Sequence, residues 1–168
     1  MSSLKTKLQE DLKEALKKGD AERVLVLRQV FSAIVNTEKE KRARVYRKEP
    51  QLTEEDLEKK SLLTDEEIIE VLSLEAKKRR EAITEFERGQ RLDLSEKEKR
   101  ELEIIQEYLP PQLSEEEIKK LAKEIIYNIG AKDLRDIGKV MAELMPKVKG
   151  RTEGSVVNKI VRELLTAS

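Results

Sequence analysis

Residues 64–89, TDEEIIEVLSLEAKKRREAITEFERG, carry the clearest helical pattern of the chain. Thr64 and Glu67 have the spacing of a capping box, in which each side chain binds the other residue's backbone amide. Gly89 is a helix stop. Apolar residues recur at helical spacing along one side of the stretch: Ile68, Leu72, Ala76, Ile83 and Phe86. The stretch therefore predicts a single helix of roughly 34 Å, at 1.5 Å per residue.

Two further helices are predicted upstream of this stretch. In the first, leucines repeat every four residues from Leu4 to Leu16, with Ser3 as the expected N-cap and Gly19 as the stop. Asp20 is expected to cap the second. Its face is formed by Val24, Leu27, Phe31, Ile34 and Val35, and is widened by Leu25, Val26 and Val30. Residues 38–49 are polar and rich in basic residues, and they predict either an exposed extension of this helix or a mobile arm.

Downstream of the long helix, the pair Pro110-Pro111 predicts a domain boundary, because two prolines cannot continue a helix. Before it, Ser95 and Glu98 are expected to form another capping box. Beyond it, three shorter helices are expected: one follows a capping box formed by Ser114 and Glu117 and stops at Gly130, the next stops near Pro146, and the last follows Thr152. No stretch alternates as a strand would. The sequence thus predicts an all-α protein, with an N-terminal helical domain of long helices (1–109) and a small C-terminal three-helix domain (110–168).

The composition argues against most catalytic sites. The chain has no histidine and no cysteine, so a Ser-His-Asp triad, a thiol nucleophile and a His- or Cys-ligated metal are excluded. The six glycines are scattered and form no phosphate-binding loop. We therefore expect no catalytic residue, metal or cofactor.

The charge and hydropathy patterns bear on the protein's surroundings. Charged residues make up 42% of the chain, with 35 basic and 35 acidic, so any nucleic-acid site must come from local segregation of charge. Abundant Glu and Lys suit a thermophilic source. No apolar run approaches the roughly 20 residues that span a bilayer. We expect a cytoplasmic protein without a membrane partner.

Three basic clusters are candidate binding surfaces. Residues 77–80 (KKRR) would spread through roughly 300° around a helix and cannot share one face. The cluster of Arg42, Arg44, Arg47 and Lys48 fits a phosphate contact and a solvated segment equally well. Residues 146–151 (PKVKGR) place three cations in a short turn without an acid, next to helix amides that suit an anion. Alternatively, their lysines complement the dipole of the preceding helix.

The sequence resembles a known family at several motifs. Residues 136–154 (DIGKVMAELMPKVKGRTEG), followed by Val157-Asn158-Lys159, resemble the signature of the YqeY-like family, and residues 107–118 (EYLPPQLSEEEI) match its inter-domain segment. The family pattern also fits Leu27-Arg28 with Ile34, Asn36 and Glu38, and residues 77–86 with Asp93 and Leu94. The C-terminal part is similar to the tail of the B subunit of the glutamine-dependent aspartyl/glutamyl-tRNA amidotransferase. Residues 45–63 are longer than the usual family connection, and nothing is carried over to them.

The resemblance implies a tail that grips tRNA while other domains do the chemistry. It favours five cations as RNA contacts: Lys139, Lys147, Lys149, Arg151 and Lys159. It assigns turn-shaping roles to Gly138, Met141, Pro146, Gly150 and Asn158. Because the chain lacks the kinase-like portion and the amidase nucleophile, we expect no autonomous catalysis. The leading hypothesis is a tRNA- or RNA-binding accessory protein that works beside the amidotransferase or the translation machinery, with no DNA partner. The alternatives are a helical protein–protein adaptor and a component of a glutamine-dependent carbon–nitrogen ligase.

Overall fold

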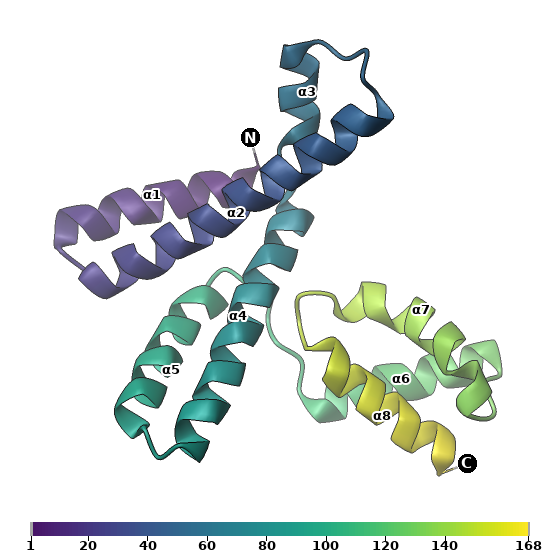
Figure 1. The fold of residues 1–168 in the computed structure, drawn as a ribbon. Coiled ribbons are helices and arrows are strands. Elements are labelled where there is room, and N and C mark those ends of the chain that lie inside the picture. The colour runs from purple at the N-terminus through teal and green to yellow at the C-terminus, as the bar shows by residue number, and fades with distance from the viewer. Residues whose placement is uncertain (1, 168) are drawn as a thin grey trace. The chain divides into compact units, whose positions relative to one another are not determined.

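The computed structural model describes residues 2–167, which form helices and no strands, so the all-α prediction is confirmed (Figure 1). The elements are α1 (Ser3–Lys18), α2 (Ala21–Lys48), α3 (Glu54–Ser61), α4 (Asp65–Arg88), α5 (Leu92–Gln106), α6 (Glu115–Ile129), the 3-10 turn η1 (Leu134–Asp136), α7 (Ile137–Val148) and α8 (Gly154–Thr166). The chain divides into two compact units, here called the N-terminal unit, which ends at Tyr108, and the C-terminal unit, which begins at Leu109.

Helix α4 is central to the N-terminal unit and follows the sequence prediction. The Thr64 hydroxyl accepts a hydrogen bond from the Glu67 amide at 3.3 Å, and the Glu67 carboxylate accepts one from the Thr64 amide at 2.8 Å. Ile68, Leu72 and Ala76 are fully buried. Helices α1, α2 and α5 each pack against part of α4 (Figure 1).

The basic residues after Asn36 continue α2 rather than forming a mobile arm. The helix runs to Lys48, and α3 packs against it. Leu57 of α3 is buried, and Lys60 forms an ion pair with Glu49 at 2.6 Å. An isolated helical extension of this polarity would have little to stabilise it, so its packing against α3 explains why it is ordered.

Two predictions for α1 were wrong. The N-cap is Ser2, whose hydroxyl accepts from the Lys5 amide at 3.0 Å, whereas the Ser3 hydroxyl donates to Asp65. Leu16 is 50% exposed, although Leu8 is fully buried. A repeat of four residues advances about 40° more than one helical turn, so the leucine stripe rotates away from the core along α1. Val35 and Leu25 of α2, at 42% and 43% exposure, also lie outside the core.

The predicted capping box at Ser95 was also wrong. Helix α5 begins four residues earlier than expected, at Leu92, with Asp93 as the acid of its first turn. Ser95 lies inside the helix and is fully buried, and its hydroxyl donates to Glu87 of α4 at 3.2 Å. Packing of α5 against α4 therefore fixes the role of this serine.

The C-terminal unit is built from α6, α7 and α8 around one aliphatic core. The capping box predicted for Ser114 and Glu117 is confirmed, with hydrogen bonds of 3.2 and 2.8 Å. Helix α6 ends at Gly130 as predicted. Helix α7 stops near Pro146 as expected, although it passes through the proline and ends two residues later, at Val148. Pro146 has no backbone amide to donate, so the last turn lacks one hydrogen bond. Burial of Val148 stabilises the helix end despite this loss.

Replacing Ser114 by alanine is expected to lower the free energy of unfolding of the C-terminal unit by about 1 kcal/mol, because the α6 amides lose their cap. The Ser114 amide lowers the pKa of the Glu117 carboxylate. This contribution is therefore present above the ordinary glutamate pKa and is lost as pH falls through the lowered value. Urea unfolding at several pH values measures both effects. The exposed Ser155 is the control position, and an equal loss in Ser155→Ala would contradict the prediction.

Candidate functional site

The basic run at residues 77–80 does not form a patch. The Lys77 ammonium group lies 3.9 Å from the Glu81 carboxylate, and Lys78 forms an ion pair with Glu75 at 2.7 Å. Arg79 points inward and is only 6% exposed. The expectation that a helix would disperse these charges is confirmed.

The second cluster lies on the last turns of α2. Arg42 forms an ion pair with Glu54 of α3, whereas Arg44, Arg47 and Lys48 are exposed. Arg44 and Lys48 are one turn apart and share a face, which leaves this surface able to contact an anion.

The third cluster, residues 146–151, is here called the basic turn. Lys147 occupies the last turn of α7 and Lys149 directly follows the helix, and both are exposed. Val148 between them is fully buried, so the two lysines project beside an anchored residue. Gly150 has a φ of 73°, a left-handed conformation that glycine adopts without the penalty a Cβ would add.

The basic turn is tied to the segment that precedes α6. The Arg151 guanidinium donates from Nε to the Pro111 carbonyl at 3.0 Å, and the Leu113 amide donates to the Arg151 carbonyl at 2.8 Å. The side-chain amide of Gln112 donates to the Gly150 carbonyl at 2.9 Å. These bonds fix the turn, and they engage one edge of the Arg151 guanidinium in a structural contact.

The remaining predicted RNA contacts lie apart from the basic turn. Lys139 is eight residues before Lys147, or about 12 Å along α7, and it forms an ion pair with Asp136 at 3.4 Å. Lys159 is exposed on α8. The structure therefore groups Lys147, Lys149 and Arg151, while the other two cations occupy separate helical positions.

The five residues assigned to shaping the turn also differ in position. Gly150 lies in the turn, Pro146 lies in the last helical turn before it, and Met141 packs partly buried against the core. Gly138 is inside α7, where an added Cβ would meet nothing within 4 Å. Asn158 is inside α8, and its Oδ1 accepts from Arg162 at 2.9 Å.

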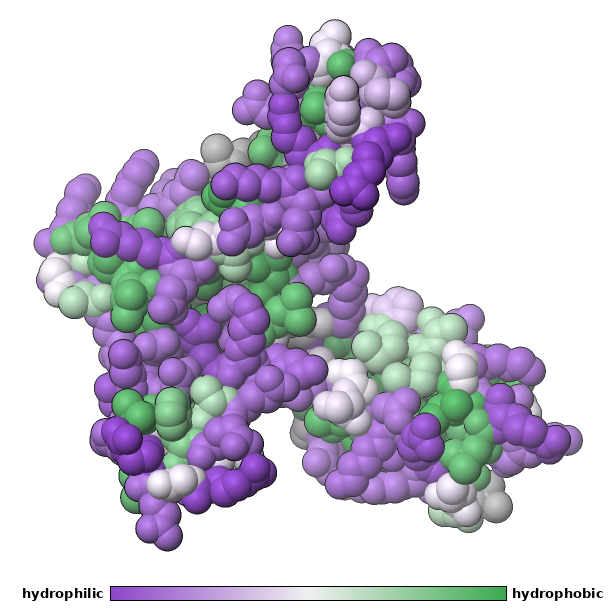
Figure 2. Space-filling view, viewed as in Figure 1, coloured by the Kyte–Doolittle hydropathy of each residue, from purple (hydrophilic) through white to green (hydrophobic). Residues whose placement is uncertain are grey.

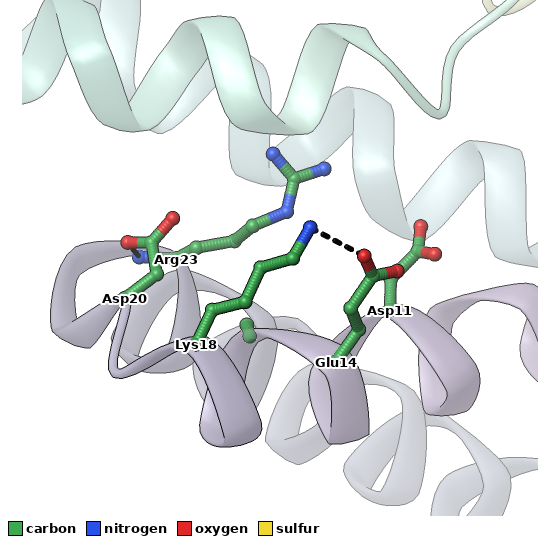
Figure 3. A pocket seen from close by; sticks show the side chains of 6 residues that line it. Asp11, Glu14, Lys18, Asp20 and Arg23 are labelled. Carbon is green, nitrogen blue, oxygen red and sulfur yellow. Dashed lines mark hydrogen bonds and ion pairs between the residues drawn. The ribbon is translucent and has the colours of Figure 1, made fainter.

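The N-terminal unit contains a charged hollow of about 270 Å³ that no pattern in the sequence predicted (Figure 3). Its side chains largely satisfy one another. Lys18 forms an ion pair with Glu14 at 2.5 Å, and Asp20 caps α2 through the Arg23 amide at 3.0 Å. The Arg23 guanidinium binds the carboxylate of Glu107 at the end of α5, which raises the pKa of Arg23. The hollow therefore resembles a structural charge network more than a ligand site.

Tyr108 joins this network to the end of α5. Its hydroxyl donates to Asp11 at 2.6 Å, and the Lys7 ammonium lies 5.3 Å from its ring centroid. Burial, aided by the bond to Asp11, raises the pKa of Tyr108 to about 12, so the phenol stays protonated near neutral pH.

Neither a metal site nor a membrane helix was found in the described part of the chain. Residues 2–167 contain no group of three or more Asp, Glu, His or Cys side chains arranged to hold a metal ion. Over the same residues, no helix combines the length and the apolar character needed to cross a bilayer. The surface seen in Figure 2 is mostly hydrophilic, with apolar side chains in small separate areas.

Two fungal proteins are similar to the chain over most of its length. Both are named Altered inheritance of mitochondria protein 41, mitochondrial. The protein of Pyrenophora tritici-repentis is 27% identical over 96% of this chain and 80% of its own length. That of Candida glabrata is 30% identical over 93% of this chain and 81% of its own length. An uncharacterized protein of Schizosaccharomyces pombe is 38% identical over a third of the chain.

These relatives overturn the predicted cytoplasmic location, because the two long matches are named as mitochondrial proteins. The prediction relied on the lack of a long apolar run. That feature does not distinguish one aqueous compartment from another.

The family assignment rests on a match over nearly the whole chain. Residues 5–165 match the family model described as Yqey-like protein. The match includes α4 with its capping box, the proline pair at the start of the C-terminal unit, and the basic turn. It therefore agrees with the motifs identified in the sequence, and the chain belongs to the YqeY-like protein family.

Proposed function

We propose that the chain is a non-catalytic RNA-binding accessory protein whose basic turn contacts the phosphate backbone of tRNA or another structured RNA. The observation that carries the proposal is the exposure of Lys147 and Lys149 on either side of buried Val148, in a stretch without an acid. Lysine ammonium groups on a fixed turn suit phosphate contacts, which position a protein on its nucleic acid.

The likeness to the amidotransferase B-subunit tail supports tRNA as the RNA, with the amidotransferase or the translation machinery as the setting. The names of the two long relatives support a mitochondrial location for this role. The family likeness supplies no catalytic residue, so the role we propose is binding.

A helical protein–protein adaptor is the second candidate, favoured by one surface. Leu74 of α4 is 60% exposed at the edge of a hollow of about 420 Å³ between α2 and α4. An exposed leucine beside a groove suits the apolar side of a partner helix. This role predicts binding that depends little on salt, whereas the RNA role predicts the opposite.

The test is tRNA binding by the nuclease-treated full chain across a range of salt concentrations. The variant Lys147→Glu/Lys149→Glu should bind more weakly. The slope of log affinity against log salt should become shallower by roughly 1.4 to 1.8, for two lost phosphate contacts. Arg151 is left in place because its side chain holds the Pro111 carbonyl.

The matched control is Lys13→Glu/Lys17→Glu, which makes the same charge change at exposed positions of α1. It should leave the slope close to that of the unmodified chain. If both variants show the same slope as each other, the basic turn does not bind RNA.

A further inference from the structure

Tyr127, near the end of α6, is 86% exposed, the highest value among the large exposed hydrophobic residues of the described chain. Tyrosine normally buries its ring and exposes only its hydroxyl, so a bare ring is unusual. It borders a hollow of about 470 Å³, within the range of ligand sites. Lys123, Ile126, Gly130, Ala131, Lys132 and Leu164 line the rest.

Two lysines line the hollow with this ring, and a third lies one turn earlier on α6. Lys120 and Lys123 precede Tyr127 by seven and four residues, so all three project from one face of α6. Lys132 reaches the same hollow because Gly130, with φ at 67°, ends the helix and turns the chain back. None of the three ammonium groups forms an ion pair with the residues that the structure describes. Glu124 and, at the start of α6, Glu116 are the acids on this face, so the three lysines outnumber them by one.

The floor of the hollow is apolar. Ile126 and Ala131 pack partly buried against the core of the C-terminal unit, as does Leu164 of α8. A flat exposed ring, an apolar floor and surrounding cations are the features with which proteins hold single-stranded nucleic acid. The ring stacks on a base, and the cations contact its phosphates.

We propose that the surface formed by Tyr127, Lys120, Lys123 and Lys132 binds an unpaired nucleotide of RNA. The base stacks on the Tyr127 ring above the apolar floor, and the lysines contact the flanking phosphates. The choice of RNA rests on the proposed function. The surface itself is separate from the basic turn: Leu164 lies ten residues beyond Gly154, or about 15 Å along α8. The apolar side of a partner helix would cover the tyrosine ring but would leave the three lysines without a counterpart, whereas RNA supplies both a base and phosphates.

The test uses the full chain with a short fluorescein-labelled oligouridylate and with a duplex RNA of equal length. Tyr127→Ala should weaken binding of the single strand by about five-fold to a hundred-fold, the usual effect of losing one stacked base. Tyr127→Phe keeps the ring and should bind as the unmodified chain does. Because Tyr127 is exposed, neither change should alter the circular dichroism spectrum or the melting temperature.

Tyrosine fluorescence provides a second readout. The chain has no tryptophan and three tyrosines, so tyrosine emission is observable. The oligouridylate should quench part of this emission in the unmodified chain and in Tyr46→Phe. This quenching should be missing in Tyr127→Phe, although the variant still binds the RNA.

The outcomes separate this inference from the proposed function. If Tyr127→Ala binds the oligouridylate as tightly as the unmodified chain does, the inference is overturned, and this face is left for a protein partner. A loss confined to Lys147→Glu/Lys149→Glu would then uphold the basic turn alone. The converse result is that Tyr127→Ala binds the single strand more weakly while Lys147→Glu/Lys149→Glu binds RNA as the unmodified chain does. That result would uphold the tyrosine surface and overturn the proposal for the basic turn. If the unmodified chain binds neither the oligouridylate nor tRNA, both proposals are overturned.

Discussion

Replacing Arg79 by leucine is expected to lower the free energy of unfolding of the N-terminal unit by about 3–5 kcal/mol. Arg79 binds the Glu75 carboxylate at 3.2 Å, the Gln29 side-chain oxygen at 2.6 Å and the Glu101 carboxylate at 3.4 Å. Both glutamates are themselves buried. Without this cation, two carboxylates stay in the interior without their main counterion. They are shielded from water there, so their charge is no longer compensated, and this makes the change costly.

Three comparison variants sharpen this experiment, which follows urea unfolding by circular dichroism. Arg79→Lys should lose an intermediate amount, because one ammonium group cannot reproduce the planar contacts of the guanidinium. Arg88→Leu, on the same helix, removes an exposed ion pair of 3.0 Å and should change stability by less than about 1 kcal/mol. The triple change Arg79→Met, Glu75→Leu and Glu101→Leu should recover much of the loss, because no charge remains buried. If Arg79→Leu and Arg88→Leu unfold at the same urea concentration, the prediction is wrong.

The Arg79 cluster shows where sequence reasoning stops. The sequence correctly indicated that residues 77–80 spread around a helix, and Arg79 lies three residues after buried Ala76, on the apolar stripe. That position was a signal that one arginine pointed inward. Its partners Gln29 and Glu101 come from α2 and α5, and no local pattern pairs residues so far apart.

The capping boxes give the same lesson within single helices. Thr64 and Ser114 were predicted correctly because every bond of a capping box lies within four residues. Ser95 has the same local pattern, yet it lies inside α5 because packing against α4 started that helix earlier. Local patterns therefore predicted the helices well, and tertiary packing decided where some of them begin and end.

The candidate sites were predictable to a smaller extent. The cations of the basic turn are adjacent in the sequence, so their proximity was apparent. The bond from Arg151 to the Pro111 carbonyl was not, because it joins residues 40 positions apart. Tyr127 carried no sequence signal, since its position next to Ile126 on an amphipathic helix fits a buried ring equally well. Its 86% exposure is a property of the packed unit.

Replacing Leu144 by alanine is expected to destabilise the C-terminal unit by about 2–5 kcal/mol. Leu144 is fully buried at the centre of α7, within the core that α6 and α8 complete. A unit of about 60 residues buries too little surface to have a large reserve of stability. The loss should therefore unfold much of the unit, and with it the basic turn and the Tyr127 surface.

Hydrogen exchange measured by mass spectrometry can locate this effect along the chain. We expect Leu144→Ala to lose protection from Leu109 onward and to retain it up to Tyr108, because each unit has its own core. Met141→Ala, at a partly buried position one turn earlier, is the matched control and should lose less. If protection falls equally in both units, they unfold as one cooperative body. Binding defects of C-terminal variants would then have to be checked for global unfolding before they are assigned to a site.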